Sequence, residues 1–449
     1  MILQPGELVS AHYSRIPCRI VDFIGGGGQG EVYRADLRGE TVAVKWYRPA
    51  LASPAQYKAL DELIGRGEPS SAFLWPLDFV TKPRSNSFGY IMPLRGHRFM
   101  PMSDLMRRNV DPDARTLATI GYSLAEAFLS LHTQGLCYRD ISFSNVFFDP
   151  GSGDVLICDN DNVTVDGSAL GRILGTPRFM APEIVRGEAL PSSRTDLFSL
   201  AVLLFNIFFI HHPFEGVSEQ RHKILDIAAM RAIYGERPVF IFDPDDDSNR
   251  PVPGPHQNAL DLWPYYPKFF RDLFIRAFTY GVADPNNGRV RESQWRKAMV
   301  RLRDSVLQCN ACGGDAESFW DASEPWSGVS CWRCGKPFTP PLYLEFDTGA
   351  RLLAMPGAQL WPHHITDIAL YDFSKAVGDI VRHPSKPSVL GIRNASEQTW
   401  HMIKASGSTQ DVVPNTSVQL VPGTSIDFGT SMAKVRVATE HVYSARLRI

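Results

Sequence analysis

The stretch LCYRDISFSNVFFD, residues 136–149, decides the fold that this sequence predicts. It follows a segment, residues 112–134, whose apolar residues recur at steps of three and four, as on one face of a helix that ends near Gly135. Asp140 can orient an attacking hydroxyl group and accept its proton, and Asn145 can reach a metal ion that is bound to phosphate groups. The stretch therefore predicts an active-site loop directly after a long amphipathic helix.

Residues 19–46 predict a glycine-rich hairpin followed by a third strand. Their order is RIVDFI, GGGGQG, EVYRADL, a turn at Gly39, and TVAVKWY, which fits antiparallel pairing. Glycines in such a hairpin allow the backbone N–H groups to lie close to a phosphate chain. The positions that match the pattern G-x-G-x-x-G-x-V are Gly25, Gly27, Gly30 and Val32.

Lys45 in VAVK lies on the third strand, 15 residues beyond Gly30. Its ammonium group can reach the α and β phosphates of a nucleotide if a carboxylate holds it in place. Ser53 and Pro54 suit the N-cap and first position of a helix that follows. Because this helix carries Glu62, we expect a Lys45–Glu62 ion pair.

Six motifs occur in one order: the glycine loop, VAVK, Glu62, YRDISFSN, the segment CDND (158–161), and GTPRFMAPE (175–183) followed by TDLFSLAVLLF. Through them, residues 19–306 resemble the protein-kinase superfamily in its Ser/Thr branch, and bacterial Hanks-type kinases in particular. The resemblance implies an α+β, bilobal protein-kinase-like fold. It also implies transfer of the γ-phosphoryl group of ATP to protein hydroxyls.

The resemblance assigns a role to each matching residue. Asp140 would be the catalytic aspartate, and Asn145 and Asp159 would hold Mg²⁺ or Mn²⁺. Asp161 is an alternative metal ligand. Asp159 is preferred, because its separation from Asn145 in the sequence is closer to the usual one in the family. Met92 would be the gatekeeper, with Leu94 in the hinge facing adenine.

The resemblance also implies two structural roles. Glu183 would pair with an arginine, expected to be Arg289, and Asp196 would brace the catalytic loop. The protein would phosphorylate itself on Thr164, Ser168 or Thr176, and this phosphate would bind near Arg139. It would thereby order the loop between Asp159 and Ala181.

Three departures from the family pattern leave a second interpretation open. Tyr138 replaces a histidine, Ser142 replaces a lysine beside the γ-phosphate, and Asp-Asn-Asp at 159–161 replaces Asp-Phe-Gly. Loss of one such donor costs about 2.7 to 4 kcal/mol in a transition state. The sequence therefore predicts a kinase, because Lys45, Asp140 and Asp159 remain, and a slow one, because the lysine that Ser142 replaces is missing. The alternative is an ATP-binding pseudokinase that serves as a signalling scaffold.

A second metal site of a different kind is predicted after residue 306. Four cysteines form C-x₂-C-x₁₈-C-x₂-C, a spacing typical of a structural Zn²⁺ ribbon. The chain has seven cysteines and no export signal, which favours a cytoplasmic location. The four predicted zinc ligands are Cys309, Cys312, Cys331 and Cys334.

Short β-like segments after residue 340 predict a β-sandwich. They vaguely resemble forkhead-associated domains but lack the serine-arginine-x-x-histidine motif, so an atypical protein-docking sandwich is expected. The predicted domains are 1–306, 307–340 and 341–449.

The composition restricts the partners that the protein is expected to have. The net charge is -2 and the motif WRCGK supplies only two basic residues, so no nucleic-acid partner is expected. The apolar run 197–210 is too short for a membrane span. Protein substrates are expected. A weak resemblance to kinases that occur with von Willebrand A-type proteins and phosphatases in stress-response clusters suggests these proteins as partners.

Overall fold

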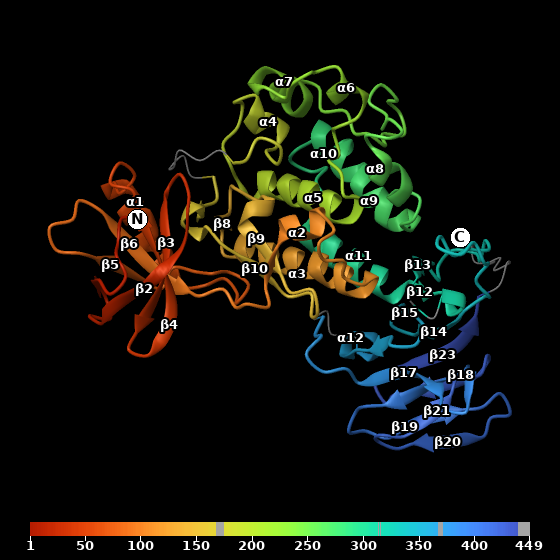
Figure 1. Cartoon of the computed structure of the whole chain (residues 1–449). Helices are drawn as coiled ribbons and strands as arrows, with labels where there is room; N and C mark the ends of the chain where they lie inside the picture. Colours follow the sequence, from red (N-terminus) through yellow and green to blue (C-terminus); the bar gives the residue numbers. More distant parts are fainter. Residues whose placement is uncertain (168–174, 313, 315, 367–370, 439–449) are drawn as a thin grey trace. The chain divides into compact units, whose positions relative to one another are not determined.

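The computed structural model describes residues 1–167, 175–312, 314, 316–366 and 371–438, and it divides the chain into two compact units (Figure 1). The first unit comprises Met1–Pro112, Thr119–Trp263 and Arg271–Arg296. The second comprises Asp113–Ala118, Pro264–Phe270 and the chain from Lys297 onwards. The predicted boundaries after residues 306 and 340 both fall within the second unit, so the division into three domains stays a prediction.

The amino-terminal part of the first unit is a closed antiparallel barrel with the strand order β1-β2-β3-β4-β6-β5. The three predicted strands are present as β2, β3 and β4. Strand β1, which pairs with both β2 and β5 and so closes the barrel, was not predicted. The strands are β1 (Leu8–Ala11), β2 (Pro17–Gly26), β3 (Gly30–Leu37), β4 (Glu40–Tyr47), β5 (Asp78–Thr81) and β6 (Phe88–Pro93).

Strand β4 separates the barrel core from the site because successive side chains point to opposite faces. Val44 and Trp46 are buried in the barrel core. Ala43 and Tyr47 belong to a different cluster on the other face. Lys45 lies between them in the sequence and therefore shares this second face, which is the face toward helix α1.

Helix α1 (Pro54–Arg66) begins at the predicted N-cap. The side chain of Ser53 accepts a hydrogen bond from the backbone N–H of Gln56, and Gly67 ends the helix with φ of 77°. Leu60 and Leu63 are its buried residues. The helix therefore packs through the face that carries positions 56, 60 and 63.

The rest of the first unit is mainly helical, and the predicted long helix is confirmed as α3 (Ala114–Thr133). The apolar run 197–210 lies in α5 (Ser193–Phe209), almost all of whose residues are buried. None of the helices in the described residues is both long and apolar enough to span a membrane. In Figure 1 the barrel and α1 form a lobe apart from α4, α5 and α7. The other helices are α2 (Met102–Met106), α4 (Pro182–Val185), α6 (Val217–Gln220), α7 (Ile227–Arg231), the π-helical η3 (Ala232–Glu236), α8 (Gln257–Leu262), α9 (Lys268–Phe278), α10 (Tyr280–Ala283) and α11 (Glu292–Asp304).

Short strands and 3₁₀ turns between these helices carry the predicted active-site segments. Strands β9 and β10 form a hairpin that also pairs with β7, and β8 pairs with β11. These elements are β7 (Met100–Pro101), β8 (Leu136–Cys137), η1 (Phe143–Asn145), β9 (Val146–Phe148), β10 (Val155–Ile157), η2 (Asn160–Asn162) and β11 (Thr164–Val165).

The second unit contains two antiparallel sheets whose inner residues form one core cluster. Antiparallel strands are therefore present in the part of the chain for which the sequence predicts short β-segments. The six-stranded sheet, in spatial order, is β15 (Arg351–Leu353), β14 (Leu342–Phe346), β23 (Met432–Val437), β22 (Ser425–Asp427), β19 (Trp400–Ile403) and β20 (Thr409–Val412). The four-stranded sheet is β16 (Gln359–Leu360), β17 (Gly378–His383), β18 (Lys386–Asn394) and β21 (Ser417–Gln419). Helix α12 (Pro362–Ile365) follows β16.

The cysteine-rich segment lies next to a core that it shares with the six-stranded sheet. Trp320 and Trp326 from this segment pack with Tyr343 and Leu353 from β14 and β15. The segment was expected to lack enough residues for a core of its own, and the structure gives it a shared one. Its regular elements are β12 (Val306–Gln308), η4 (Asn310–Cys312) and β13 (Glu317–Phe319), and β12 pairs with β13.

Candidate active site and metal centre

Lys45 is buried at the centre of a polar network on the α1 side of β4. Its side chain is 5% exposed, and Nζ lies 2.8 Å and 3.0 Å from the two carboxylate oxygens of Asp161. Asp159 Oδ1 lies 3.4 Å away and Gln29 Oε1 lies 2.9 Å away. Burial opposes the charged form of Lys45, but the two carboxylates outweigh it and raise its pKa.

Asp161 is the main counter-ion of Lys45 and has no free acceptor position. Tyr47 donates to Oδ2 at 2.6 Å and Tyr90 donates to Oδ1 at 3.2 Å. With the two contacts from Lys45, these donors fill the roughly four lone-pair sites of a carboxylate. Burial raises the pKa of Asp161, but the charge of Lys45 and these hydrogen bonds outweigh it, so the pKa is lowered.

Asp159 has a different environment, although it is only two residues away. Its side chain is 41% exposed, whereas that of Asp161 is 1% exposed. Asp159 adopts a left-handed backbone conformation, with φ of 54°, just before the turn η2. Partial burial and the negative charge of Asp161 raise the pKa of Asp159, against the effect of Lys45.

The expected Lys45–Glu62 ion pair is not formed among the described residues. Glu62 is exposed, because the buried face of α1 carries Leu60 and Leu63 and position 62 lies off that face. Gln56 is the polar residue on the buried face. Its amide donates to Tyr47 Oη at 3.2 Å and to the backbone oxygen of Asp161 at 3.5 Å.

The glycine loop is the hairpin between β2 and β3. Gly25 faces Val32 in the strand register, and the N–H of Gly27 donates to the oxygen of Gly30 at 2.9 Å. An added Cβ at Gly30 would lie 2.2 Å from the backbone oxygen of Trp46, so strand packing alone requires glycine there. At Gly25 and Gly27 a Cβ would meet no atom of the described residues within 4 Å, which leaves room on this side of the loop among them.

Gln29, at the tip of the glycine loop, connects this loop to the turn η2 that follows Asp159. Its Oε1 accepts from Lys45, and its Nε2 donates to Asn162 Oδ1 at 3.1 Å. The loop, the lysine and the turn η2 are therefore parts of one hydrogen-bonded network.

The catalytic-loop residues surround Asp140. Thr176 Oγ1 donates to Asp140 Oδ1 at 2.7 Å, and Asn145 Nδ2 donates to the backbone oxygen of Asp140 at 2.9 Å and to Oδ2 at 3.3 Å. Ser142 is buried, and its hydroxyl lies 2.9 Å from that of Ser144, which in turn donates to Asn145 Oδ1 at 3.2 Å. Ser142 thus supports the amide of Asn145 through Ser144. Ser168, one of the predicted phosphorylation sites, lies outside the described residues.

The hairpin of β9 and β10 places Asn145 and Asp159 near each other along the backbone. Val146 faces Ile157 in the register, and the N–H of Cys158 donates to the oxygen of Asn145 at 2.9 Å. Asp159 is the next residue. The backbones of both predicted magnesium ligands are therefore positioned at the same end of one strand pair.

Asp196 braces the catalytic loop, as expected. Its carboxylate accepts the backbone N–H groups of Tyr138 at 2.5 Å and Arg139 at 3.0 Å. Tyr138 is fully buried, and its hydroxyl donates to the oxygen of Cys158. The tyrosine that replaces histidine therefore packs in the scaffold below the loop.

The expected ion pair of Glu183 with Arg289 is also confirmed. Arg289 Nη2 lies 2.6 Å from Glu183 Oε1. This pair attaches α4 to the segment before α11.

The hinge residues line an apolar cluster next to the glycine loop. Met92 is buried with Ala43 and Leu156, and Val32 and Leu94 pack against this cluster. The strand register pairs Met92 with Ala43, so the hinge segment continues directly from β6. This apolar surface is suited to the ring of a purine base.

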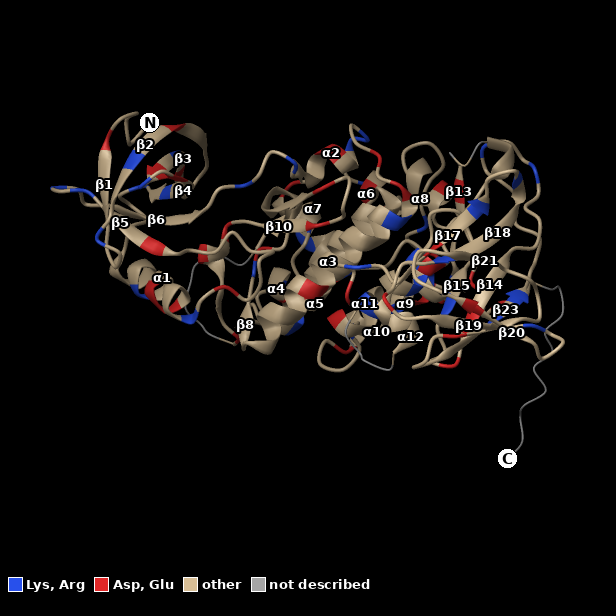
Figure 2. Ribbon diagram, turned by 90° about the horizontal axis from the view of Figure 1, so that it is seen from below, with Lys and Arg blue, Asp and Glu red and all other residues tan. Residues whose placement is uncertain are grey.

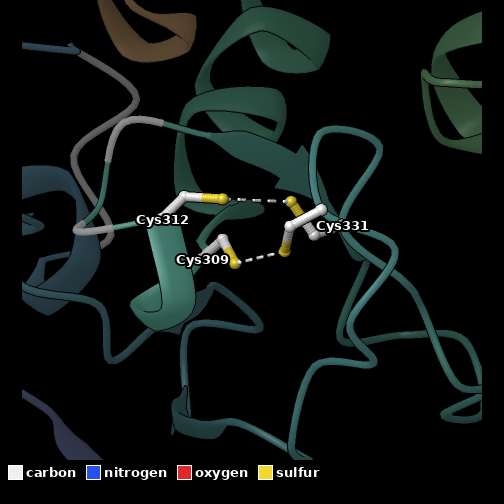
Figure 3. A group of neighbouring side chains, drawn as sticks. Cys309, Cys312 and Cys331 are labelled. Atoms are coloured by element: carbon white, nitrogen blue, oxygen red, sulfur yellow. Dashed lines mark hydrogen bonds between the residues drawn. The ribbon is translucent and has the colours of Figure 1, made fainter.

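The four predicted zinc ligands come together in the second unit, as the labelled Cys309, Cys312 and Cys331 in Figure 3 show. The sulfurs of Cys309 and Cys334 lie 3.8 Å apart and those of Cys312 and Cys331 lie 3.9 Å apart. A tetrahedron with Zn–S bonds of about 2.3 Å has edges of about 3.8 Å. A disulfide would need a separation of about 2.05 Å. The donor set therefore fits a structural zinc ion.

Four residues of the Lys45 network were not identified from the sequence: Gln29, Gln56, Tyr47 and Tyr90. Helical spacing offered a signal for Gln56, which lies four and seven residues before Leu60 and Leu63. Strand alternation offered one for Tyr47, two residues after Lys45. Gln29 and Tyr90 have no comparable signal in the sequence, because their contacts depend on the tertiary structure.

The pH dependence of stability should reveal His132, which lies between Asp196 and Glu292. Burial lowers its pKa, but the two carboxylates outweigh burial and raise it to about 9. A rise from 6.5 to about 9 in the folded state corresponds to roughly 3 kcal/mol. Because the folded pKa is the higher one, this stabilisation is complete below pH 6.5 and is lost as the pH rises through 9.

We therefore expect His132→Gln to lower the free energy of unfolding in urea strongly at about pH 6 and much less at about pH 9.5. His222→Gln, at an exposed histidine, is the matched control and should have little effect at either pH. An equal effect of His132→Gln at both pH values would contradict this assignment.

Zinc content should depend on the four cysteines. We expect about one Zn²⁺ per purified chain by atomic emission, almost none in Cys331→Ser, and an unfolding midpoint that falls with the metal. Cys158→Ser, outside the cluster, should keep its zinc. A folded wild-type protein without zinc, or a Cys331→Ser variant that retains it, would refute the site.

Comparison with known proteins agrees with this geometry. Residues 18–262, more than half of the chain, match the family described as the protein kinase domain. The chain is 29% identical over 231 residues to the DNA damage-responsive serine/threonine-protein kinase RqkA of Deinococcus radiodurans, which covers 49% of this chain and 33% of that protein. It is 30% identical over 226 residues to the serine/threonine-protein kinase PknK of Mycobacterium tuberculosis, which covers 48% of this chain and 19% of that protein.

The matched stretch spans a third or less of the length of these relatives. The matched residues include the glycine loop, Lys45, the catalytic loop and the hairpin that carries Asp159. The chain therefore belongs to the protein kinase family.

Proposed function

We propose that this protein is an ATP-dependent Ser/Thr protein kinase that transfers the γ-phosphoryl group to protein hydroxyls, its own included. The observation that carries the proposal is the arrangement at Asp140. One carboxylate oxygen accepts a hydrogen bond from the hydroxyl of Thr176 at 2.7 Å, and the other lies 3.3 Å from the amide of Asn145. A carboxylate held in this way can accept a proton from an attacking hydroxyl group.

In the proposed reaction, the acceptor oxygen bonds to the γ-phosphorus of ATP, and the bond between that phosphorus and the β–γ bridging oxygen breaks. Asp140 takes the hydroxyl proton, and ADP leaves. Lys45 would contact the α and β phosphates, and the N–H groups of the glycine loop would lie along them. The open side of Gly25 and Gly27 leaves room for this phosphate chain.

We propose that Asn145 and Asp159 hold Mg²⁺ or Mn²⁺, which would neutralise charge on the transferred phosphoryl group. Carboxylate and amide oxygens are the donors that these hard cations prefer. Asp159 suits this role better than Asp161, because Asp159 is partly exposed and has a single contact with Lys45. The acceptor positions of Asp161 are already filled.

The adenine ring would lie against the cluster of Met92, Leu94 and Val32, which supplies an apolar surface beside the hinge. Backbone groups after β6 would provide its hydrogen bonds. This part of the proposal follows the family pattern, and the burial of Met92 beside Ala43 supports it.

The alternative is an ATP-binding pseudokinase. Ser142 is its strongest support, because a serine replaces the lysine that would contact the γ-phosphate. Against it stand the buried Lys45 network and the ordered contacts of Asp140 with Asn145. These contacts favour a catalyst, with a rate that is reduced by the missing cation.

For the second unit we propose a zinc ribbon at 307–340 and an atypical forkhead-associated-like β-sandwich at 341–449 that docks proteins. The shared core of its two sheets supports the sandwich interpretation. Protein substrates, including von Willebrand A-type proteins and phosphatases, and a cytoplasmic location belong to this proposal. Acidic and basic residues are interspersed along the chain (Figure 2), which agrees with protein partners rather than nucleic acid.

Transfer of radiolabelled phosphate from ATP, with Mg²⁺ or Mn²⁺, to the protein itself and to a generic protein acceptor tests this function. We expect Asp140→Asn to lower the rate by at least about 100-fold, because the general base is lost. Asp154→Asn, at an exposed aspartate, is the matched control and should react like the wild type. Equal rates for Asp140→Asn and wild type would refute the role of Asp140, and ATP binding without transfer in the wild type would establish the pseudokinase.

A further inference from the structure

The family mechanism requires a carboxylate that fixes the strand lysine, and helix α1 does not provide one here. In the described residues, the face of α1 toward Lys45 carries Gln56 with Leu60 and Leu63, and Glu62 is exposed. An amide cannot neutralise an ammonium group. The buried charge of Lys45 therefore needs its partner elsewhere.

Asp161 is the closer of the two carboxylates that Lys45 contacts. It lies two residues after the aspartate that we assign to the metal ion, where the family has glycine. Its carboxylate accepts both short contacts from Lys45, at 2.8 Å and 3.0 Å. Tyr47 and Tyr90 complete its hydrogen bonds, so the pair is buried with its polar atoms satisfied.

We propose that Asp161 is the positioning residue for Lys45, in place of a carboxylate on helix α1, and that the Asp-Asn-Asp turn thereby serves both charges of the site. This inference rests on the proposed function and names how that site is assembled. The Asp159 carboxylate is partly exposed and available to a metal ion, whereas that of Asp161 is buried and makes the shorter contacts with the lysine. The family distributes these two tasks between the helix and the Asp-Phe-Gly segment.

The conformation of the turn explains how neighbouring aspartates divide these tasks. Asp159 is left-handed, and Asn160 Nδ2 donates to the backbone oxygen of Ile157 at 3.0 Å. The N–H of Val163 then closes the turn on the oxygen of Asn160 at 3.1 Å. In this turn the Asp161 carboxylate is buried, while that of Asp159 stays partly exposed with one longer contact to Lys45.

A consequence concerns control of the site. In the family, displacement of the helix separates the lysine from its carboxylate. Here, in the described residues, α1 approaches the pair through the neutral amide of Gln56, which lies 3.2 Å from Tyr47 Oη and 3.5 Å from the backbone oxygen of Asp161. A shift of the turn at 159–162 would disturb the lysine and the metal ligand together.

The test compares Asp161→Asn, Glu62→Gln and the double variant Asp161→Asn/Gln56→Glu in the full chain. The double variant returns a carboxylate to the helix face beside Lys45. Calorimetry gives the affinities for ADP and adenosine, and steady-state transfer gives kcat and the KM for ATP. Because Lys45 contacts phosphates and not the base, ADP and adenosine separate its positioning from general damage.

We expect Asp161→Asn to weaken ADP by about tenfold and adenosine hardly at all, with a matching loss of kcat/KM. Gln56→Glu in the double variant should recover most of that loss. Glu62→Gln should remain within about twofold of wild type, as expected for an exposed residue.

Three results would overturn the proposal: unchanged ADP affinity in Asp161→Asn, equal weakening of ADP and adenosine, or a large effect of Glu62→Gln. If the wild type binds ADP but transfers no phosphate, the kinase function fails, while selective weakening of ADP in Asp161→Asn still supports the positioning role. If Asp161→Asn does not fold, the double variant is compared with Lys45→Met/Asp161→Asn. Equal ADP affinity of these two variants would then overturn it.

Discussion

A buried ion pair between Lys45 and Asp161 connects the amino-terminal barrel with the segment that follows β10. Two charged groups taken out of water are tolerated only where each is paired and its remaining hydrogen-bonding positions are filled. Tyr47, Tyr90 and Gln29 supply those bonds. This ion pair consequently holds four elements together: the glycine loop, strand β4, helix α1 and the turn η2. We place the phosphates of ATP beside it.

The catalytic loop depends on a second buried carboxylate. Asp196 accepts two successive backbone N–H groups, those of Tyr138 and Arg139, and so fixes the backbone immediately before Asp140. His132 joins the same carboxylate to Glu292 on α11. Asp196 thus holds the backbone before the proposed catalytic aspartate through main-chain N–H groups, which is why a tyrosine can occupy position 138 without loss of the loop.

The second unit uses a different means of stabilisation. Its cysteine segment has few regular elements, and its four sulfurs lie at the separations that a tetrahedral zinc ion requires. The tryptophans at 320 and 326 add apolar packing against β14 and β15. A shared core, together with the zinc ion that we propose for the four cysteines, would hold a segment this short in one conformation.

The sequence alone determined much of this protein, because its signals are local. Strand alternation placed β2 to β4, Ser53 and Gly67 bounded α1, and spacing placed Asp140, Asn145 and the four cysteines. Side chains that meet across long separations were decided only by the tertiary structure. Glu62 had the right type and the right helix but the wrong face, since the packing of Leu60 and Leu63 turned it outward. Asp161 became the main partner of Lys45 because the turn that starts at the left-handed Asp159 buries the Asp161 carboxylate and leaves that of Asp159 partly exposed, and local sequence patterns do not encode that geometry.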